Sequence, residues 1–254
     1  QTVKNQVDVS LSSMKAAFNM REKLLNHLRW FYTSAMDQAR QHPVKGYVFG
    51  DGNDASKNQL MLDILKTHQV EVYALKQDHQ AAPGRFAPGS AWIVPTGQPQ
   101  FRMVRTLFET MLHFEDSLFY DVSTWTLPLA FQMPHMPLTS ERQVQALIQT
   151  ESTRAVFPKG LVLEGEDVYA WVFSWEEYYA PRALYHLQKE GIRTKVATRP
   201  FTITHDGRKI DMDFGSILVH VQTQDHSPER IRELLEEAAQ ISGIVVYPVA
   251  TGLT

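Results

Sequence analysis

The residue types that carry chemistry are concentrated in one stretch, residues 113–135, which reads HFEDSLFYDVSTWTLPLAFQMPH. Its carboxylates and aromatic rings include Glu115, Asp116, Tyr120, Asp121 and Trp125. Paired carboxylates can act as acid and base when their environments separate their pKa values. The same residues can instead contact a ligand, or fix the shape of the loop after a helix while the rings pack beneath. We favour the structural role, keep ligand binding by these five residues as an alternative, and expect no catalytic residue.

Other catalytic signatures are weak. The sequence contains no cysteine, which excludes thiol catalysis and thiolate metal sites. His226 and Glu229 have the spacing of a zinc-binding His-x-x-Glu pair. Ser227 and Pro228 between them are also typical of a helix start, and capping accounts for all four residues. We therefore expect neither a metal nor another cofactor.

The segment GDGND, residues 50–54, follows a predicted strand and precedes a predicted helix, as an anion-binding turn would. It lacks the spacing of a P-loop or dinucleotide motif, and its two aspartates repel phosphate. The segment instead predicts a strand-to-helix turn in which Asn53 or Asp54 caps the helix.

The bulk composition describes an ordinary globular protein, with 254 residues, 43% hydrophobic residues and a formal net charge of −3. No basic tail or lysine/arginine run is present, so a nucleic-acid partner is not expected. No apolar run approaches the ~18 residues of a membrane helix, so we expect no membrane association.

Residues 10–41 contain neither glycine nor proline, and their apolar residues recur near a helical period. We predict one long helix or two joined helices, ended by Pro43, lying against whatever follows.

The rest of the chain alternates between short strands and helices. In the first half we predict strands at 46–50, 70–75, 90–95 and 124–130, with helices at 57–68 and 99–113. In the second half we predict strands at 169–174, 192–197, 215–221 and 245–250, a hairpin turn at 205–208, and helices at 175–191 and 227–243.

The two halves resemble each other at a nearly constant offset, which predicts an internal duplication. Phe49 matches Phe173, and residues 125–128 match 245–248. The predicted fold class is α/β, with an N-terminal helical segment followed by two duplicated β-α-β-β-α-β modules. Each module is either a ferredoxin-like sandwich or a three-layer sandwich. The predicted boundaries are 1–43 for the helical segment, 44–135 and 167–254 for the modules, and 136–166 for the connector.

Several phrases of the sequence resemble a region downstream of the catalytic domain in large bacterial zinc carboxypeptidase-like proteins, which are multidomain relatives of carboxypeptidase A-type metallopeptidases. The phrases, in chain order, are FNMREKLLNHLRWFY, GYVFGDGND, FAPGSAWIVPTGQPQFRMVRTLFE, DSLFYDVSTWTLPLAF, VATRPFTI and VYPVATGLT.

The resemblance implies a non-catalytic accessory domain that supports the peptidase domain or access to its substrate. The peptidase zinc ligands, general base and carboxylate-binding arginine have no counterparts in this sequence. The implied partners are the peptidase and C-terminal domains of the full-length protein, in a periplasmic or extracellular setting. A second interpretation, from the duplication, is a module that binds a small ligand or peptide in the crevice between the halves.

Overall fold

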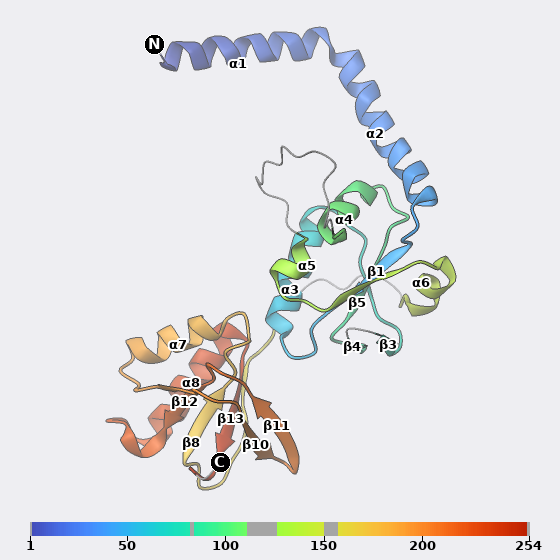
Figure 1. Ribbon diagram of the computed structural model, residues 1–254. Coiled ribbons are helices and arrows are strands. Elements are labelled where there is room, and N and C mark those ends of the chain that lie inside the picture. The colour runs from blue at the N-terminus through green and yellow to red at the C-terminus, as the bar shows by residue number, and fades with distance from the viewer. Residues whose placement is uncertain (1, 82–83, 111–125, 150–156, 253–254) are drawn as a thin grey trace.

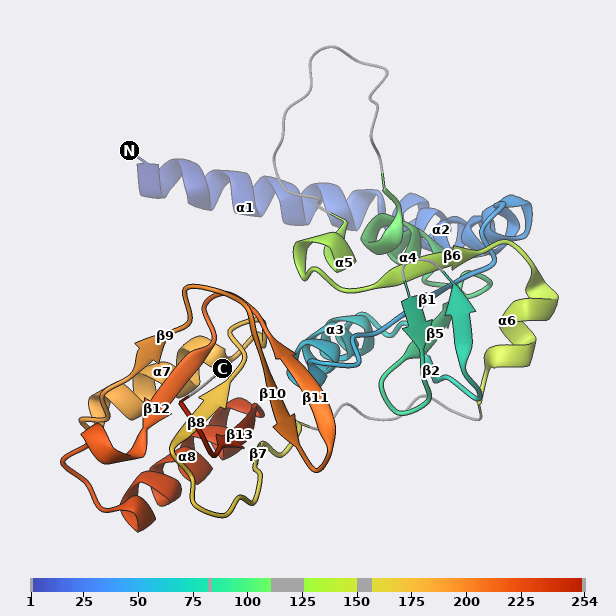
Figure 2. The same ribbon diagram turned by 60° about the horizontal axis from the view of Figure 1, so that its bottom comes forward.

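The structure, a computed structural model, describes residues 2–81, 84–110, 126–149 and 157–252. It is a mixed α/β structure in which two helices precede two units, each built around its own sheet (Figures 1 and 2). We call these the first unit, from β1 to α6, and the second unit, from β7 to β13.

The first unit has a four-stranded sheet with the order β2-β5-β1-β6. Its strands are β1 (Gly46–Phe49), β2 (Tyr73–Ala74), β5 (Trp92–Pro95) and β6 (His135–Leu138). The central strand β1 pairs antiparallel with β5 and with β6. All four β1 residues are buried because both faces of the sheet are covered.

Tyr47 and Phe49 join one hydrophobic cluster with residues of α3 (Ala55–Thr67) and α4 (Phe101–Phe108). Val48 joins a second cluster that includes Phe86 from the hairpin β3–β4 (His79–Ala81 and Gly84–Phe86) and residues of α6 (Glu141–Leu147). Successive strand residues point to opposite faces, so each layer receives alternate side chains of β1.

The second unit has a five-stranded sheet with the order β7-β13-β8-β12-β9. Its strands are β7 (Leu161–Val162), β8 (Ala170–Phe173), β9 (Lys195–Val196), β12 (Ile217–His220) and β13 (Val245–Val249). The central strand β8 is again buried throughout and antiparallel to both neighbours, β12 and β13.

Its two faces are covered in the same manner. Trp171 and Phe173 cluster with residues of α7 (Ala180–Lys189) and α8 (Pro228–Ser242). Ala170 and Val172 cluster with residues of the hairpin β10–β11 (Phe201–His205 and Arg208–Met212). A short 3-10 helix, η1 (Val221–Thr223), follows β12.

Local signals at element ends are confirmed. Ser227 caps α8 by accepting from the backbone N–H of Arg230 over 3.3 Å. Asp206 and Gly207 turn the hairpin β10–β11 with φ of 49° and 73°, as an Asp-Gly type I′ turn requires. Gly191, with φ of 80°, follows α7.

The predicted strand at 124–130 is wrong where the structure describes it, because Leu127–Ala130 form the short helix α5. Pro128 lies in its first turn, where the missing N–H has no consequence. The fourth strand is β6, and it is Pro137 that pairs with Tyr47. The predicted match of residues 125–128 with 245–248 therefore fails. The predicted helix at 99–113 also ends early, since α4 ends at Phe108.

The N-terminal segment is helical, as predicted, but it does not lie along the units. Helices α1 (Thr2–Asn19) and α2 (Arg21–Gln41) meet in a bend at Met20 (Figure 1). None of the described side chains of α1 is buried, and only Ala35 and Ala39 are buried in α2. Among the described residues, the expectation that the segment packs along its length is wrong, because only the end of α2 is buried against the first unit.

Candidate functional site

The residues predicted to contact a ligand, Glu115, Asp116, Tyr120, Asp121 and Trp125, lie outside the described residues. The end of the same stretch is described, and it lies at the junction of the two units. The rings of Phe131 and Tyr178 meet in a T-shaped arrangement, with 5.9 Å between ring centroids.

The junction is held by direct polar bonds. Asp54, only 3% exposed, caps α3 because its Oδ1 accepts from the backbone N–H of Lys57 over 2.8 Å. Its Oδ2 accepts from the backbone N–H of Tyr178, in the second unit, over 2.6 Å. The hydroxyl of Ser56 donates to the carbonyl of Ser242 over 3.2 Å. One carboxylate thus both starts a helix and joins the units, and the predicted cap is confirmed at Asp54.

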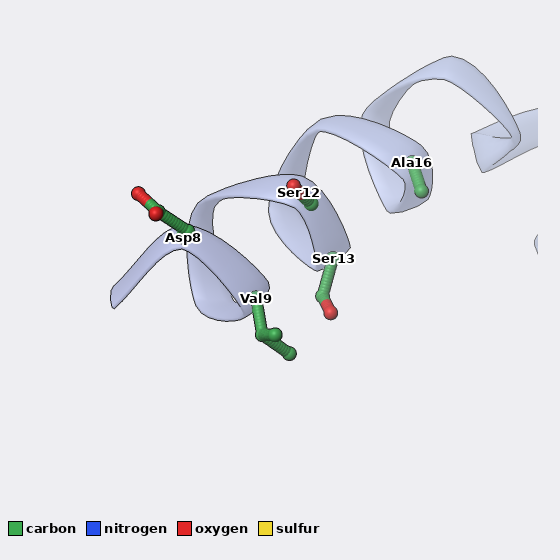
Figure 3. A pocket seen from close by; sticks show the side chains of 5 residues that line it. All are labelled: Asp8, Val9, Ser12, Ser13 and Ala16. Carbon is green, nitrogen blue, oxygen red and sulfur yellow. The ribbon is translucent and has the colours of Figure 1, made fainter. Parts of the chain in front are cut away.

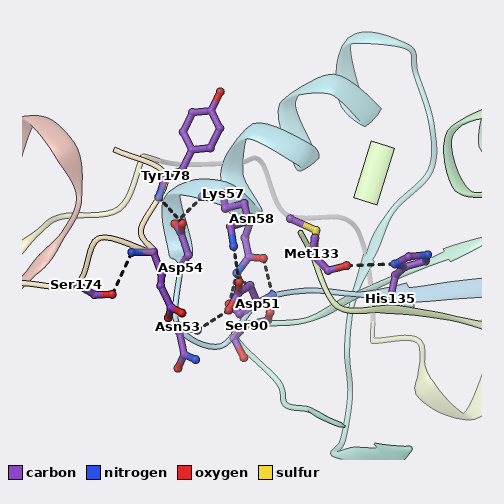
Figure 4. A network of polar contacts seen from close by, with 11 residues as sticks. Asp51, Asn53, Asp54, Lys57, Asn58, Ser90, Met133, His135, Ser174 and Tyr178 are labelled. Carbon is purple, nitrogen blue, oxygen red and sulfur yellow. Dashed lines mark hydrogen bonds and ion pairs between the residues drawn. The ribbon is translucent and has the colours of Figure 1, made fainter. Parts of the chain in front are cut away.

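The turn between β1 and α3 is fixed by reciprocal bonds (Figure 4). Asn58, 2% exposed, accepts from the N–H of Asp51 over 2.8 Å and donates to the Asp51 carbonyl over 2.7 Å. The ammonium of Lys57 lies 2.6 Å from Oδ2 of Asp51, and both side chains are largely buried. The acidic turn is therefore rigid, with one of its charges already paired.

A cleft of about 610 Å³ opens beside this turn, and we call it the inter-unit cleft. The first unit contributes Asp51, Gly52, Asn53, Asp54, Lys57 and, after α5, Gln132. The second unit contributes Ser174, Glu176, Glu177, Ile210, Asp211, Met212, Val245 and Tyr247. Five of these residues carry a carboxylate and one carries an ammonium group, so the charge of the cleft favours a cation.

Glu177 is the most perturbed group of the cleft. Burial is the main cause that raises the pKa of its carboxyl to about 8, and the negative charge of Asp54 raises this pKa further. The backbone N–H of Val245, which donates to Oε1 over 3.3 Å, acts in the opposite direction. The Glu177 carboxyl therefore carries a proton at neutral pH. A cation placed beside it would favour release of that proton, because the ionised form would then gain a partner. Burial and the charge of Glu177 also raise the pKa of Tyr247.

The described lining contains neither a histidine nor a cysteine. A carboxylate cluster with one internal ion pair is suited to holding a ligand by charge and hydrogen bonds. The arrangement supports binding more directly than nucleophilic catalysis.

Glu229 lies in the first turn of α8, which Ser227 caps, as the capping explanation predicts, whereas His226 has a partner in another part of the chain. Nε2 of His226 lies 3.1 Å from the carbonyl of Glu190. Hydrogen bonds to its own backbone and to Ser227 lower the pKa of Glu229. Over the described ranges, no three or more His, Cys, Asp or Glu side chains are placed to hold a metal ion. None of the helices in those ranges is long and apolar enough to cross a membrane.

Comparisons with protein-family models, with curated proteins and with solved structures find no match for this chain. What the chain does is therefore inferred from the inter-unit cleft itself.

The sequence predicts the turn at residues 50–54 that forms part of one wall of this cleft, but it predicts neither wall as a binding surface. Asp54 was predicted as a helix cap, and the acidic character of residues 50–54 was visible. Glu177 lies in a stretch, WEEYY, that was predicted to be helical from residue 175, whereas α7 begins at Ala180. Nothing in the sequence pairs Glu177 with Asp54, because their proximity arises from the docking of the two units.

Proposed function

We propose that this chain is a non-catalytic binding module that holds a positively charged group of a peptide or small ligand in the inter-unit cleft. The observation that carries the proposal is a cleft walled by both units, with five carboxylates facing one lysine. Lys57 is already bound to Asp51, which leaves Asp54, Glu176 and Asp211 outside that pair. Glu177 is the fourth acidic residue outside it, and its carboxyl gains a charge only when it loses its proton.

Some of these carboxylates have partners that orient them. Asp54 accepts two backbone N–H groups, and Oδ1 of Asp211 accepts from the hydroxyl of Thr202 over 2.8 Å. Each carboxylate retains further lone pairs, since an ionised carboxylate accepts about four hydrogen bonds. An ammonium or guanidinium group of the ligand would use these sites and would favour ionisation of Glu177.

Capped peptides in which every terminal charge is removed would test the proposal. The probe is acetyl-Gly-Arg-Gly-amide, and the matched control is acetyl-Gly-Gln-Gly-amide. With isotope-labelled protein, the arginine peptide should shift the amide signals of Tyr178 and Val245, whose N–H groups donate to cleft carboxylates. Equal shifts with both peptides, or shifts confined to residues outside the cleft, would contradict a site for cations.

For the setting of this module, we propose the accessory region of an exported zinc carboxypeptidase-like protein. The support is the set of sequence phrases that resemble such a region, together with a cleft suited to binding and not to catalysis. In this setting the cleft would hold substrate or a segment of a neighbouring domain. Hydrolysis of peptides above background by the purified chain, with or without added zinc, would refute the non-catalytic role.

We further propose that the two units are copies of one β-α-β-β-α-β plan of the ferredoxin-like type. The order β2-β5-β1-β6 corresponds to β9-β12-β8-β13, and in each unit a hairpin follows the second strand. Tyr47 pairs with Val94 and Pro137, as Trp171 pairs with Val219 and Pro248. The shared register supports a duplication with β6, in place of residues 124–130, as the fourth strand.

A further inference from the structure

The residues of α1 and α2 follow a seven-residue repeat with one largely apolar face. Positions separated alternately by four and three residues form what we call the heptad stripe: Val7, Leu11, Met14, Phe18, Arg21, Leu25, Leu28, Tyr32, Ala35 and Ala39. Arg21 is its one charged member. A repeat averaging 3.5 residues is characteristic of helices that pack lengthwise against another helix.

The heptad stripe is covered at one end and uncovered along the rest. Ala35 and Ala39 are 0% and 3% exposed and cluster with Phe101 of α4. By contrast, Phe18 and Leu25 are 68% and 66% exposed. The same face therefore serves as a helix-packing surface where α4 reaches it, and it continues toward Val7 without a cover among the described residues.

The other faces of α1 differ in character. Figure 3 shows Asp8, Val9, Ser12, Ser13 and Ala16 around a shallow hollow that is bounded by α1 alone, and none of them belongs to the heptad stripe. These side chains are small or polar, with the exception of Val9. The hollow has no second wall, so the heptad stripe is the surface suited to a partner.

The charges beside the heptad stripe are self-complementary. One edge of the stripe is formed by the residues that directly follow Val7, Met14, Arg21 and Leu28. The sign of the charge alternates along this edge, through Asp8, Lys15, Glu22 and Arg29. If a second copy runs antiparallel, Asp8 faces Arg29 of the second copy and Lys15 faces Glu22 of the second copy. Edge charges of this kind set the orientation and partner of paired helices.

We propose that the heptad stripe binds the heptad stripe of a second copy of this chain, in antiparallel orientation, with α1 of one copy along α2 of the other. In this register Leu11 lies against Leu28 and Met14 against Leu25 of the second copy. Within each copy the Arg21 guanidinium already lies 4.9 Å from the Phe18 ring centroid. In this register the Phe18–Arg21 pair of one copy lies beside that of the other, so Arg21 has an aromatic neighbour at the contact.

Other registers conflict with the charges. A parallel pair would place Arg21 against Arg21 inside the contact. Sliding the antiparallel pair by seven residues would place Lys15 against Lys15, and Asp8 against Glu22. Like charges held together oppose association, so the parallel pair and the antiparallel pair displaced by seven residues are both disfavoured.

The bend at Met20 is compatible with this pairing. It lies between Phe18 and Arg21, next to the two-fold axis of the proposed dimer, so each arm pairs with the opposite arm of the other copy. The helical hydrogen bonds continue across it, since Met20 N–H reaches the Ala16 carbonyl and Leu24 N–H the Met20 carbonyl, each over 2.9 Å.

The molar mass of the full chain in solution tests the dimer. Light scattering at about 100 µM should give twice the 29.1 kDa of one chain. Leu11→Asp should give the single-chain mass with the fold intact, because α1 buries no described side chain. Its control, Ser12→Asp on the face shown in Figure 3, should remain dimeric. A single-chain mass for the unmodified protein, or a dimeric Leu11→Asp, would overturn the proposal.

A charge exchange tests the register. Lys15→Glu should raise the dimer dissociation constant about tenfold, since two contacts become repulsive. The double variant Lys15→Glu/Glu22→Lys should restore it to within about twofold of the unmodified protein. A double variant as weak as the single one would overturn the antiparallel register.

Disulfide formation tests the orientation without interference, because the chain has no native cysteine. Leu11→Cys and Leu28→Cys should each fail to cross-link alone and should cross-link when the two are mixed. Cross-linking of either variant with itself would show parallel pairing and overturn the proposal.

Discussion

The backbone N–H of Tyr178 donates to Oδ2 of Asp54 over 2.6 Å, and this bond connects the second unit to the helix cap of α3. The cleft lies beside it, so the geometry of the binding surface depends on a carboxylate that also holds the two units together.

Replacing Asp54 should destabilise the protein more than loss of a cap alone. Asp54→Ala should lower the free energy of unfolding by about 2–3 kcal/mol, because it leaves both the Lys57 and Tyr178 N–H groups without acceptors. Urea denaturation measures the change. The matched control is Ser140→Ala, which removes the cap of α6 and should cost about 1 kcal/mol. Equal losses in the two variants would show that the Tyr178 bond contributes nothing.

Glu177 should make stability depend on pH. Its pKa rises from 4.5 to about 8 on folding, so between these values the native state holds a proton that the unfolded state has released. The free energy of unfolding should therefore fall as pH rises from about 5 to 8 and level off above that. Glu177→Gln should remove this slope. At pH 8.5 it should stabilise the protein by about 2 kcal/mol, which is less than the full pKa shift implies because solvent partly screens the Glu177 charge.

The control for that experiment is Glu166→Gln, which changes an exposed carboxylate outside the cleft lining. Urea denaturation at pH 5, 7 and 8.5 compares the three proteins. An unmodified protein that gains stability over this range relative to Glu177→Gln would show that the Glu177 pKa is lowered and not raised.

Gly243 should be intolerant of a side chain for two reasons. Its φ is 71°, and an added Cβ would lie 2.5 Å from Oγ of Ser56 across the junction. Gly243→Ala should therefore cost about 2–3 kcal/mol of unfolding free energy. Gly207→Ala, at φ of 73° with no atom within 4 Å, isolates the backbone contribution and should cost about 1 kcal/mol. Similar losses at both positions would show that Ser56 moves aside freely.

Features that depend on residues close together in sequence could be predicted, whereas features that depend on contacts between distant residues could not. Caps and turns depend on neighbours in sequence, so Asp54, Ser227 and the Asp206–Gly207 turn were predictable. The segment at 124–130 alternates like a strand, but a proline in an early turn is equally compatible with a helix, and only the pairing of β6 with β1 decides between them.

The partners of the cleft depend on contacts between distant parts of the chain. The proximity of Glu177 to Asp54 results from docking of one unit on the other, which no local pattern encodes. The exposure of Phe18 and Leu25 was also unpredictable, since an apolar stripe looks the same whether the chain or another molecule covers it.

The pH dependence of probe binding tests the central claim most directly. Calorimetric titration with acetyl-Gly-Arg-Gly-amide should show affinity rising between pH 6 and 8.5, by at most about tenfold per unit, because Glu177 must lose its proton to face the cation. Glu177→Gln should bind more weakly at pH 8.5 and show no such rise. Affinity that is independent of pH, or unchanged by Glu177→Gln, would contradict cation binding in the inter-unit cleft.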